Sequence, residues 1–170
     1  EQVLQKGPTD LRMNLIYDVC HNIAKWEHHE IDGRRRRLCV HRKGATRAFP
    51  PGHPETPAAY RDVGQPVLIP GDMGRWSWVL TGQPGSMQQT FGTTCHGAGR
   101  QMSRTEARQR VSRKAFQQQV GRLWYDHRRA DRLRDEAPAA YKDIRRVMRA
   151  QRPLTRTVRE LRPLLSYKGC

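Results

Sequence analysis

Short apolar runs recur through the first half of the chain, and glycine, proline and charged residues separate them. Runs of this length predict strands, because a short strand needs only a few apolar positions to bury one face. The predicted strands are residues 11–19, 38–41, 67–69 and 76–80. The connections predicted between them are a charged hairpin tip at 32–37, a proline-rich loop at 49–54 and a turn at 82–85.

Beyond residue 103 the apolar spacing changes to three and four residues, which predicts helices. Ser103 and Glu106 fit a capping box, so a helix is predicted over 104–122. A second helix is predicted to start near Pro138, a favourable first-turn residue. Its apolar stripe would contain Tyr141, Ile144, Val147 and Met148. Residues 154–165 also show helical spacing, although Pro163 would end such a helix.

The order of these elements favours an α+β fold, with strands in the first part packed against helices concentrated in the C-terminal part. Alternating strands and helices, which a parallel α/β sheet requires, are not predicted. The 170 residues suit a single domain or a large part of one.

Positive charge dominates the composition. The chain has 32 Lys and Arg against 16 Asp and Glu, a formal net charge of +16. This balance favours a polyanionic partner, nucleic acid first among them. The alternative is a basic protein from an arginine-rich proteome whose charges are merely solvated.

Cysteine spacing and hydropathy bear on the compartment. The 4 cysteines have none of the short spacings of a zinc or redox site, and no apolar run is long enough to span a membrane. No signal peptide is visible, so we expect reduced thiols and a cytoplasmic protein. Cys20 is expected to face the core, opposite its neighbour His21 on a strand.

Residues 95–104, Cys-His-Gly-Ala-Gly-Arg-Gln-Met-Ser-Arg, combine side chains suited to phosphate chemistry. Glycine lets a ligand approach the backbone closely, and arginine can bind phosphate with two parallel hydrogen bonds. The neutral imidazole of His96 is a candidate nucleophile or general base in a reaction at phosphorus. The alternative is a structural histidine in a glycine turn.

Several blocks together resemble the RtcB family of RNA ligases, and they occur in that family's order. They are residues 17–25, 40–50, 64–74, 95–104, 136–144 and 168–169. The resemblance covers the C-terminal part of a family member, so residues 1–170 would be one portion of an RtcB-like catalytic domain. The upstream half, with an Asp-x-x-Cys motif and further metal-binding histidines, has no counterpart here.

The resemblance implies a GTP- and Mn²⁺-dependent ligase that joins RNA 3′-phosphate or 2′,3′-cyclic phosphate ends to 5′-hydroxyl ends. His96 would carry GMP covalently, and His21 would be a manganese ligand rather than a satisfied core histidine. The residues implied in nucleotide binding, besides His96, are Asn22, Pro70, Gly71, Asp72, Met73, Ser77, Gly97, Ala98, Gly99, Tyr141 and Lys168.

The sequence leaves the roles of three of these residues open. Asp72 would accept hydrogen bonds from the guanine edge, although some family members have serine there. Tyr141 would either cover the guanine or belong to the helix stripe. Lys168 resembles the family's penultimate lysine, and the extra Cys170 after Gly169 departs from that pattern.

Basic side chains near these blocks are candidates for RNA phosphate contacts, which supply affinity rather than sequence specificity. They are Arg42, Lys43, Arg47, Arg100 and Arg104. Arg34 to Arg37 are expected to be a solvated loop tip. The expected partners are RNA ends and an archease-type activator, and we expect a monomer.

Two other functions are weighed against the ligase. A catalytically incomplete, basic RNA-binding remnant of the same family would keep the fold without the metal site. A ribosomal-type basic protein would explain the charge, but not the order of the His21, Pro70-Gly71 and His96 blocks.

Overall fold

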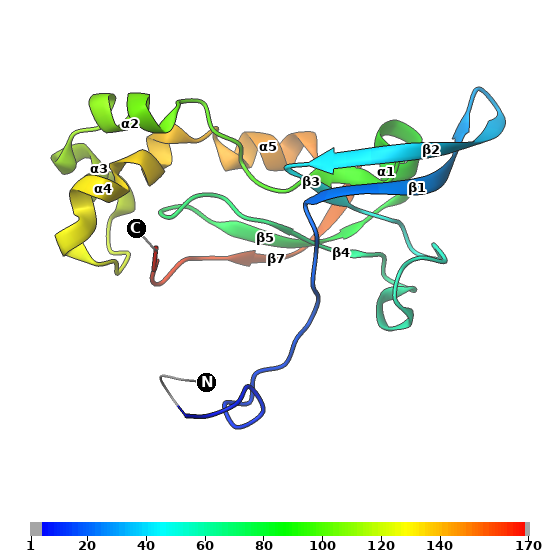
Figure 1. Cartoon of the computed structure of the whole chain (residues 1–170), viewed down its shortest axis with the longest axis horizontal. Helices are drawn as coiled ribbons and strands as arrows, with labels where there is room; N and C mark the ends of the chain where they lie inside the picture. The colour runs from blue at the N-terminus through cyan, green and yellow to red at the C-terminus, as the bar shows by residue number, and fades with distance from the viewer. Residues whose placement is uncertain (1–4, 169–170) are drawn as a thin grey trace.

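The first regular element is a long hairpin. In the computed structural model, which describes residues 5–168, β1 (Asn22–Ile31) pairs antiparallel with β2 (Arg34–Lys43). Asp32 and Gly33 form the tip with φ of 50° and 70°, as a two-residue hairpin turn requires. The predicted strand 38–41 is confirmed within β2, but the tip is shorter than predicted, because all four arginines of 34–37 belong to the strand. Figure 1 shows the hairpin projecting at one end of the molecule.

The apolar run near the start of the chain is not a strand, so that prediction is wrong. Within the described residues, 13–20 have no regular structure, and Leu15 and Ile16 are 84% and 74% exposed. No neighbouring strand offers backbone partners here, and a strand without partners is not stable. The Tyr60 hydroxyl bonds to the Ile16 carbonyl, and Gln65 Nε2 donates to Tyr17 Oη at 2.8 Å. Cys20 is exposed, so its predicted place in the core is also wrong.

A three-stranded antiparallel sheet forms the centre of the fold. Its order is β4 (Pro66–Ile69), β5 (Ser77–Gly82) and β7 (Thr155–Leu161). The strands predicted at 67–69 and 76–80 are thereby confirmed. The helix predicted over 154–165 is wrong, because these residues pair along β5 with a register shift at Val79/Leu80. Thr155, Thr157 and Val158 are β-branched, which suits an edge strand better than a helix.

The helix predicted over 104–122 divides in two. α2 (Arg104–Arg110) starts at Ser103, whose hydroxyl accepts from Glu106 N at 3.1 Å, as the capping box predicts. Val111 leaves the helical conformation, and Ser112 caps α3 (Arg113–Val120) by accepting from Ala115 N at 3.1 Å. A second serine cap therefore restarts the helix.

The other helices are short. α1 (Pro84–Thr90) occupies the predicted turn at 82–85, with proline at its start, and α4 (Ala130–Leu133) is a single turn. The helix predicted near Pro138 begins later, as α5 (Ile144–Ala150), where Asp143 caps it. The 3-10 helices are Ala58–Tyr60, His127–Arg129, Arg134–Glu136 and Pro138–Ala140.

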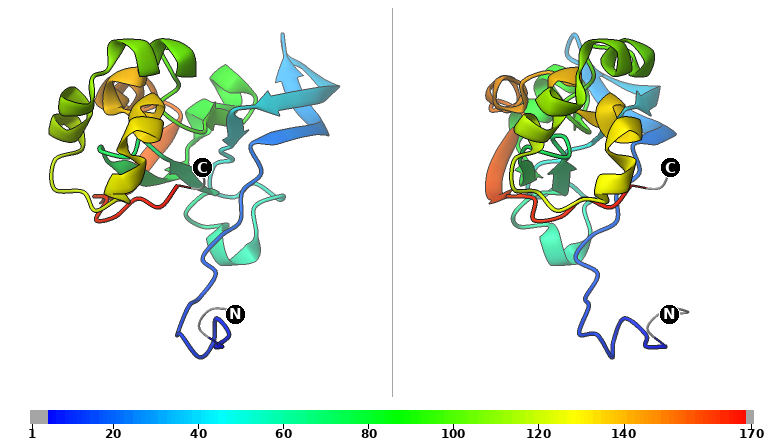
Figure 2. Two further views of the ribbon diagram at one scale, coloured as in Figure 1. Left: turned by 60° about the vertical axis from the view of Figure 1, so that its left-hand side comes forward. Right: turned by 90° about the vertical axis from the view of Figure 1, so that its left-hand side faces the viewer.

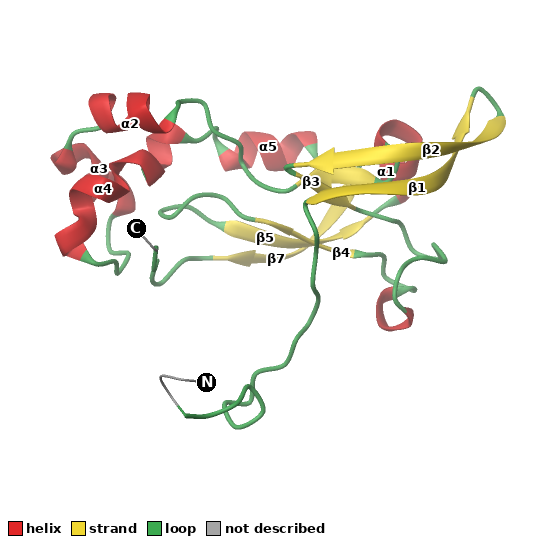
Figure 3. Ribbon diagram, in the orientation of Figure 1, coloured by secondary structure: helices red, strands yellow, loops and turns green. Residues whose placement is uncertain are grey.

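Two apolar cores result. One lies among α2, α3 and α4 and centres on Phe116 and Tyr125, and the other lies between the sheet and α5. Figure 3 shows α2, α3 and α4 gathered at one end, α5 and the three-stranded sheet in the middle, and the hairpin with α1 towards the other end. Mixed helices and strands agree with the α+β prediction, although β7 follows the helices in sequence. None of the helices within 5–168 has the length and hydropathy needed to cross a bilayer.

Candidate active site

Two histidines that are far apart in the sequence lie against each other. The rings of His21 and His96 are stacked, with centroids 4.2 Å apart and an interplanar angle of 6°. Gly44 joins their backbones, because its N–H donates to His21 O at 2.9 Å and its carbonyl accepts from His96 N at 3.2 Å. The Asn22 amide oxygen lies at the same junction, 3.3 Å from Gly44 N. Three of the predicted site residues therefore meet where β2 ends.

A short sheet holds this junction in register. β3 (Ala45–Arg47) pairs with β6 (Thr93–Cys95), and Ala45 lies opposite Cys95. His96 directly follows β6, while His21 directly precedes β1. The hairpin therefore positions His21, and β6 positions His96.

The environment of His96 favours a neutral ring. Burial, together with the neighbouring His21, lowers the pKa of His96 from its ordinary value. Its Nδ1 is buried and has no hydrogen-bond partner within the described part of the chain. Nε2 is not such a buried, unpartnered atom, so it is the ring nitrogen open to a ligand; in the neutral tautomer protonated on Nδ1 it carries the free lone pair.

A cavity of about 420 Å³ opens beside this junction, within the size range of small-molecule sites. Its lining includes ten residues predicted to bind nucleotide: Pro70, Gly71, Asp72, Met73, Ser77, Gly97, Ala98, Gly99, Tyr141 and Lys168. The Ala98 amide donates to Pro70 O at 3.2 Å, which joins the loop that contains Gly71 to the loop that contains Gly97 and Gly99. That bond commits the Ala98 amide, so it is not available to a phosphate.

Four residues of the lining were not predicted from the sequence: Glu136, Pro163, Leu165 and Ser166. Glu136 stands within the block 136–144, which was an available signal, although that block alone gave it no role. The other three follow β7, and a helix was predicted there.

Glu136 is the charged centre of the cavity wall. It accepts a hydrogen bond from Tyr141 Oη at 2.6 Å and lies 3.5 Å from Arg100 and 3.6 Å from Lys168. Burial alone would raise the pKa of Glu136, but the Tyr141 bond and the nearby cations lower it overall. Burial and the Glu136 carboxylate raise the pKa of Tyr141 to about 12. Tyr141 therefore remains a neutral donor, with its ring against both the cavity and the sheet core.

Asp72 does not have the free carboxylate that was expected. Its side chain is fully buried, and Oδ1 accepts from the backbone amides of Gly74 and Arg75, each at 3.0 Å. Oδ2 pairs with Arg75 Nε at 2.5 Å. The carboxylate shapes its own loop, so the predicted contact with the guanine edge does not fit this geometry.

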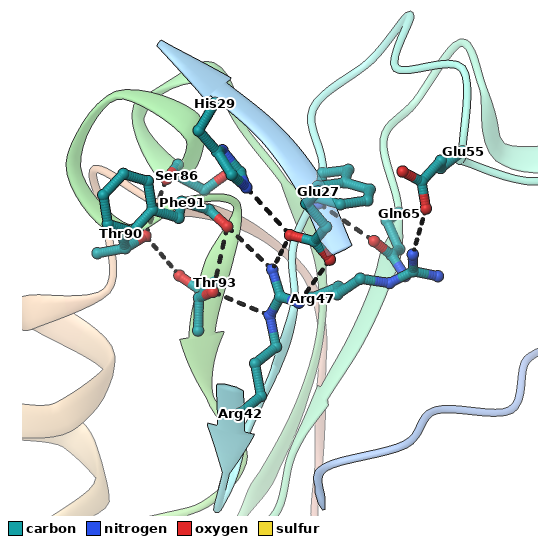
Figure 4. A network of polar contacts seen from close by, with 11 residues as sticks. Glu27, His29, Arg42, Arg47, Glu55, Gln65, Ser86, Thr90, Phe91 and Thr93 are labelled. Atoms are coloured by element: carbon teal, nitrogen blue, oxygen red, sulfur yellow. Dashed lines mark hydrogen bonds and ion pairs between the residues drawn. The ribbon is translucent and has the colours of Figure 1, made fainter. Parts of the chain in front are cut away.

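Arg42 is not an RNA contact, and that prediction is wrong. Its guanidinium is buried and binds both oxygens of Glu27, at 2.7 and 2.8 Å. It also donates to Thr93 Oγ1 at 3.0 Å and to Phe91 O at 2.9 Å, while His29 bonds to Glu27 at 3.0 Å. Figure 4 shows this network between the hairpin and the turn that leads into β6. The network therefore fixes the hairpin relative to the segment that carries His96.

The other predicted RNA contacts divide by exposure. Arg47 pairs with Glu55 at 2.8 Å, and its side chain is 18% exposed. Arg100 donates to Met102 O, Tyr141 Oη and Asp135 O and so braces the cavity wall. Lys43 is exposed, and the Arg104 side chain is 69% exposed. These two are the predicted contacts that face solvent most openly.

The sequence matches a known family over nearly its whole length. The family model of tRNA-splicing ligase RtcB matches residues 1–169. The chain belongs to the RtcB family. It is 48% identical over 173 residues to a tRNA-splicing ligase RtcB of Pyrococcus abyssi, covering 99% of this chain and 19% of that protein.

Further relatives agree. A tRNA-splicing ligase RtcB of Thermococcus kodakarensis is 49% identical over 175 residues, covering 99% of this chain and 36% of that protein. RNA-splicing ligase RtcB homolog 1 of Entamoeba histolytica is 45% identical over 173 residues, covering 99% and 33%. The chain thus spans between 19% and 36% of these relatives' lengths.

RtcB membership raises the question of the metal. Among residues 5–168, no three His, Cys, Asp or Glu side chains are grouped so that they could hold an ion. His21 would supply one nitrogen, and transition metals in proteins take several ligands. The described residues therefore do not fit a complete manganese site by themselves.

Proposed function

We propose that this chain forms the nucleotide-binding, histidine-bearing portion of a GTP-dependent RNA ligase. The ligase would join RNA 3′-phosphate or 2′,3′-cyclic phosphate ends to 5′-hydroxyl ends. The observation that carries the proposal is the place of His96. It is stacked on His21, and the residue that follows it, Gly97, lines the cavity that ten predicted nucleotide-binding residues form.

In the proposed first step, neutral His96 Nε2 attacks the α-phosphorus of GTP. A P–N bond forms, the bond from the α-phosphorus to the bridging oxygen breaks, and pyrophosphate leaves with that electron pair. The lowered pKa of His96 keeps the attacking lone pair free at neutral pH. Lys168 and Arg100, which flank Glu136 in the structure, would offset the negative charge of the bound nucleotide.

In the later steps, GMP would pass to the RNA. An oxygen of the RNA 3′-phosphate attacks the guanylate phosphorus and releases His96, and the 5′-hydroxyl then attacks the activated 3′-phosphate and releases GMP. A cyclic phosphate is first opened by water. Bound Mn²⁺ would neutralise phosphate charge, with His21 as one ligand and the others from outside the described residues.

Labelling with GTP tests the proposal. The chain, together with the family's upstream half, is incubated with α-labelled GTP and Mn²⁺ and analysed under denaturing conditions. We expect acid-labile label on the wild type and none on His96→Ala. His28→Ala, which changes an exposed histidine outside the site, should label normally. Absence of label on the wild type would overturn the proposal.

The second candidate is a basic RNA-binding remnant without catalysis. The lack of a metal-binding cluster among the described residues favours it. Wild-type protein that binds RNA but takes no label in the experiment above would identify the remnant.

A further inference from the structure

Arginines are concentrated in one segment outside the cavity. Residues 145–162 contain Arg145, Arg146, Arg149, Arg152, Arg156, Arg159 and Arg162, and the single acid of this segment is Glu160. All seven are exposed. Figure 2 shows α5 and β7, which carry most of them, next to each other on the side of the molecule opposite the hairpin.

These seven arginines differ from those at the helical end of the molecule. There, several arginines form ion pairs with carboxylates: Arg104, Arg108, Arg110, Arg113, Arg128, Arg129 and Arg134. Within residues 5–168, no carboxylate lies within ion-pair distance of any of the seven. Unpaired like charges repel one another and disfavour the compact state. An external polyanion would relieve that repulsion.

Four of the arginines form a continuous row, which we call the arginine stripe: Arg145, Arg149, Arg152 and Arg162. The first three are spaced four and three residues apart, so they share one face of α5 and its C-terminal turn. Arg145 and Arg162 both lie over the Trp76 ring, 4.0 and 5.5 Å from its centroid. Trp76 thereby links the helix row to the end of β7.

The stripe reaches the rim of the nucleotide cavity. Trp76 precedes Ser77, and Arg162 precedes Pro163, and both of these next residues line the cavity. A chain that leaves the cavity at this rim would meet Arg162 and Arg145 first and then Arg149 and Arg152. The Trp76 ring is already covered by two guanidinium groups, so the stripe offers charge and hydrogen-bond donors rather than a stacking platform.

We propose that the arginine stripe binds the phosphate backbone of the RNA beyond the end that is joined. It is a sequence-independent surface, because guanidinium groups that contact phosphates read charge and spacing rather than bases. The proposal rests on the proposed function for the identity of the polyanion as RNA. It extends that function from the reacting end to the body of the substrate.

The salt dependence of RNA binding provides a quantitative expectation for the proposal. Each phosphate neutralised on a single strand contributes about −0.7 to the slope of log K against log salt. Removing two contacts, in the variant Arg149→Gln/Arg152→Gln, should therefore make the slope shallower by about 1.4. The charge-conserving variant Arg149→Lys/Arg152→Lys should keep most of the slope.

The experiment measures binding of a single-stranded RNA with a 3′-phosphate to the full chain over a series of salt concentrations. The matched control is Arg35→Gln/Arg36→Gln, which removes two exposed arginines of β2 that also lack an ion pair within the described residues. Labelling with GTP alone involves no RNA and should be unchanged in the stripe variant. We expect weaker binding and a shallower slope for the stripe variant than for the hairpin control.

Equal losses in the two variants would mean that net charge alone sets affinity, and would overturn the stripe. Unchanged RNA binding together with lost binding of polyglutamate would also overturn it, in favour of an acidic polypeptide partner. Failure of the ligase proposal leaves a different pattern: the wild type takes no GTP label, while the difference between stripe and hairpin variants persists.

Discussion

Tyr141 shows how one side chain can belong to a core and to a cavity at once. Sequence left open whether it covers a ligand or packs in a helix stripe. In the structure its ring packs against the sheet core, lines the cavity and lies 4.8 Å from the Arg100 guanidinium. Its hydroxyl donates to Glu136; this bond adds to the effect of burial on the pKa of Tyr141 and opposes the effect of burial on the pKa of Glu136. The ionisation of Tyr141 and that of Glu136 are therefore linked through this hydrogen bond.

Removing the Glu136 carboxylate should lower the pKa of Tyr141. The wild-type value is about 12, raised first by burial and then by Glu136. In Glu136→Gln the burial remains but the negative charge is gone, so the pKa should fall part of the way towards the ordinary value near 10. Phenolate absorbance against pH, with Tyr141→Phe as the blank, measures it. Glu106→Gln should have no effect, and an unchanged Tyr141 pKa in Glu136→Gln would contradict the assigned contact.

At the scale of elements, the hairpin is held at its base by a buried ion pair. Arg42 on β2 binds Glu27 on β1. It also binds the Phe91 carbonyl after α1 and the hydroxyl of Thr93, the first residue of β6. The same two segments carry His21 and His96 to their stacked position. Burial alone would raise the pKa of Glu27, but Arg42 and His29 lower it overall. The contribution to stability is therefore present at neutral pH and is lost as the pH falls through the lowered pKa.

Breaking this pair on one side should be more costly than removing it whole. Arg42→Met leaves a buried, unpaired Glu27 and should reduce the free energy of unfolding by about 3–5 kcal/mol. The double variant Glu27→Gln/Arg42→Met should recover a substantial part of that loss, as a double-mutant cycle from urea unfolding would measure. Arg110→Met removes an exposed pair with Glu106 and should cost about 1 kcal/mol or less. Equal losses for Arg42→Met and Arg110→Met would contradict the buried network.

At the scale of the whole molecule, the nucleotide cavity and the metal site differ in completeness. The cavity is lined by residues from four separate parts of the chain, around positions 70–77, 97–99, 136–141 and 163–168. Among the described residues, no three His, Cys, Asp or Glu side chains are grouped to hold an ion, so His21 has no complete ligand set there. The proposed nucleotide site is therefore formed by the described residues, whereas the proposed metal site needs ligands from outside them.

The 170 residues alone should bind Mn²⁺ weakly, because one imidazole cannot replace the ion's water shell effectively. Titration followed by the electron paramagnetic resonance of free Mn²⁺ measures this. Adding the family's upstream half should raise the affinity for wild type and His28→Ala, and much less for His21→Ala. Stoichiometric, tight binding by the 170 residues alone would contradict the expected division of ligands.

Several elements were determined by the sequence alone, because they depend on interactions between residues that are close together in the chain. Val67 to Ile69 form a strand stopped by proline, and Ser103 starts a helix, because turn residues and caps act on their own neighbours. Most of the cavity lining was also predicted, from the resemblance to the RtcB family, whose blocks at 64–74 and 95–104 are each continuous in sequence. Glu136 gave a weaker signal, because its role depends on Tyr141, Lys168 and Arg100 meeting it.

Only the tertiary structure decided which segments find partners. Residues 155–161 form a strand because β5 offers them an edge, while residues 13–19 contain an apolar run but have no edge to join. Arg42 is buried rather than presented to RNA because Glu27 lies across the hairpin from it. The stacking of His21 on His96 likewise depends on two strand pairings between distant residues. Pairing and burial are properties of both partners together, so neither partner's local sequence contains them.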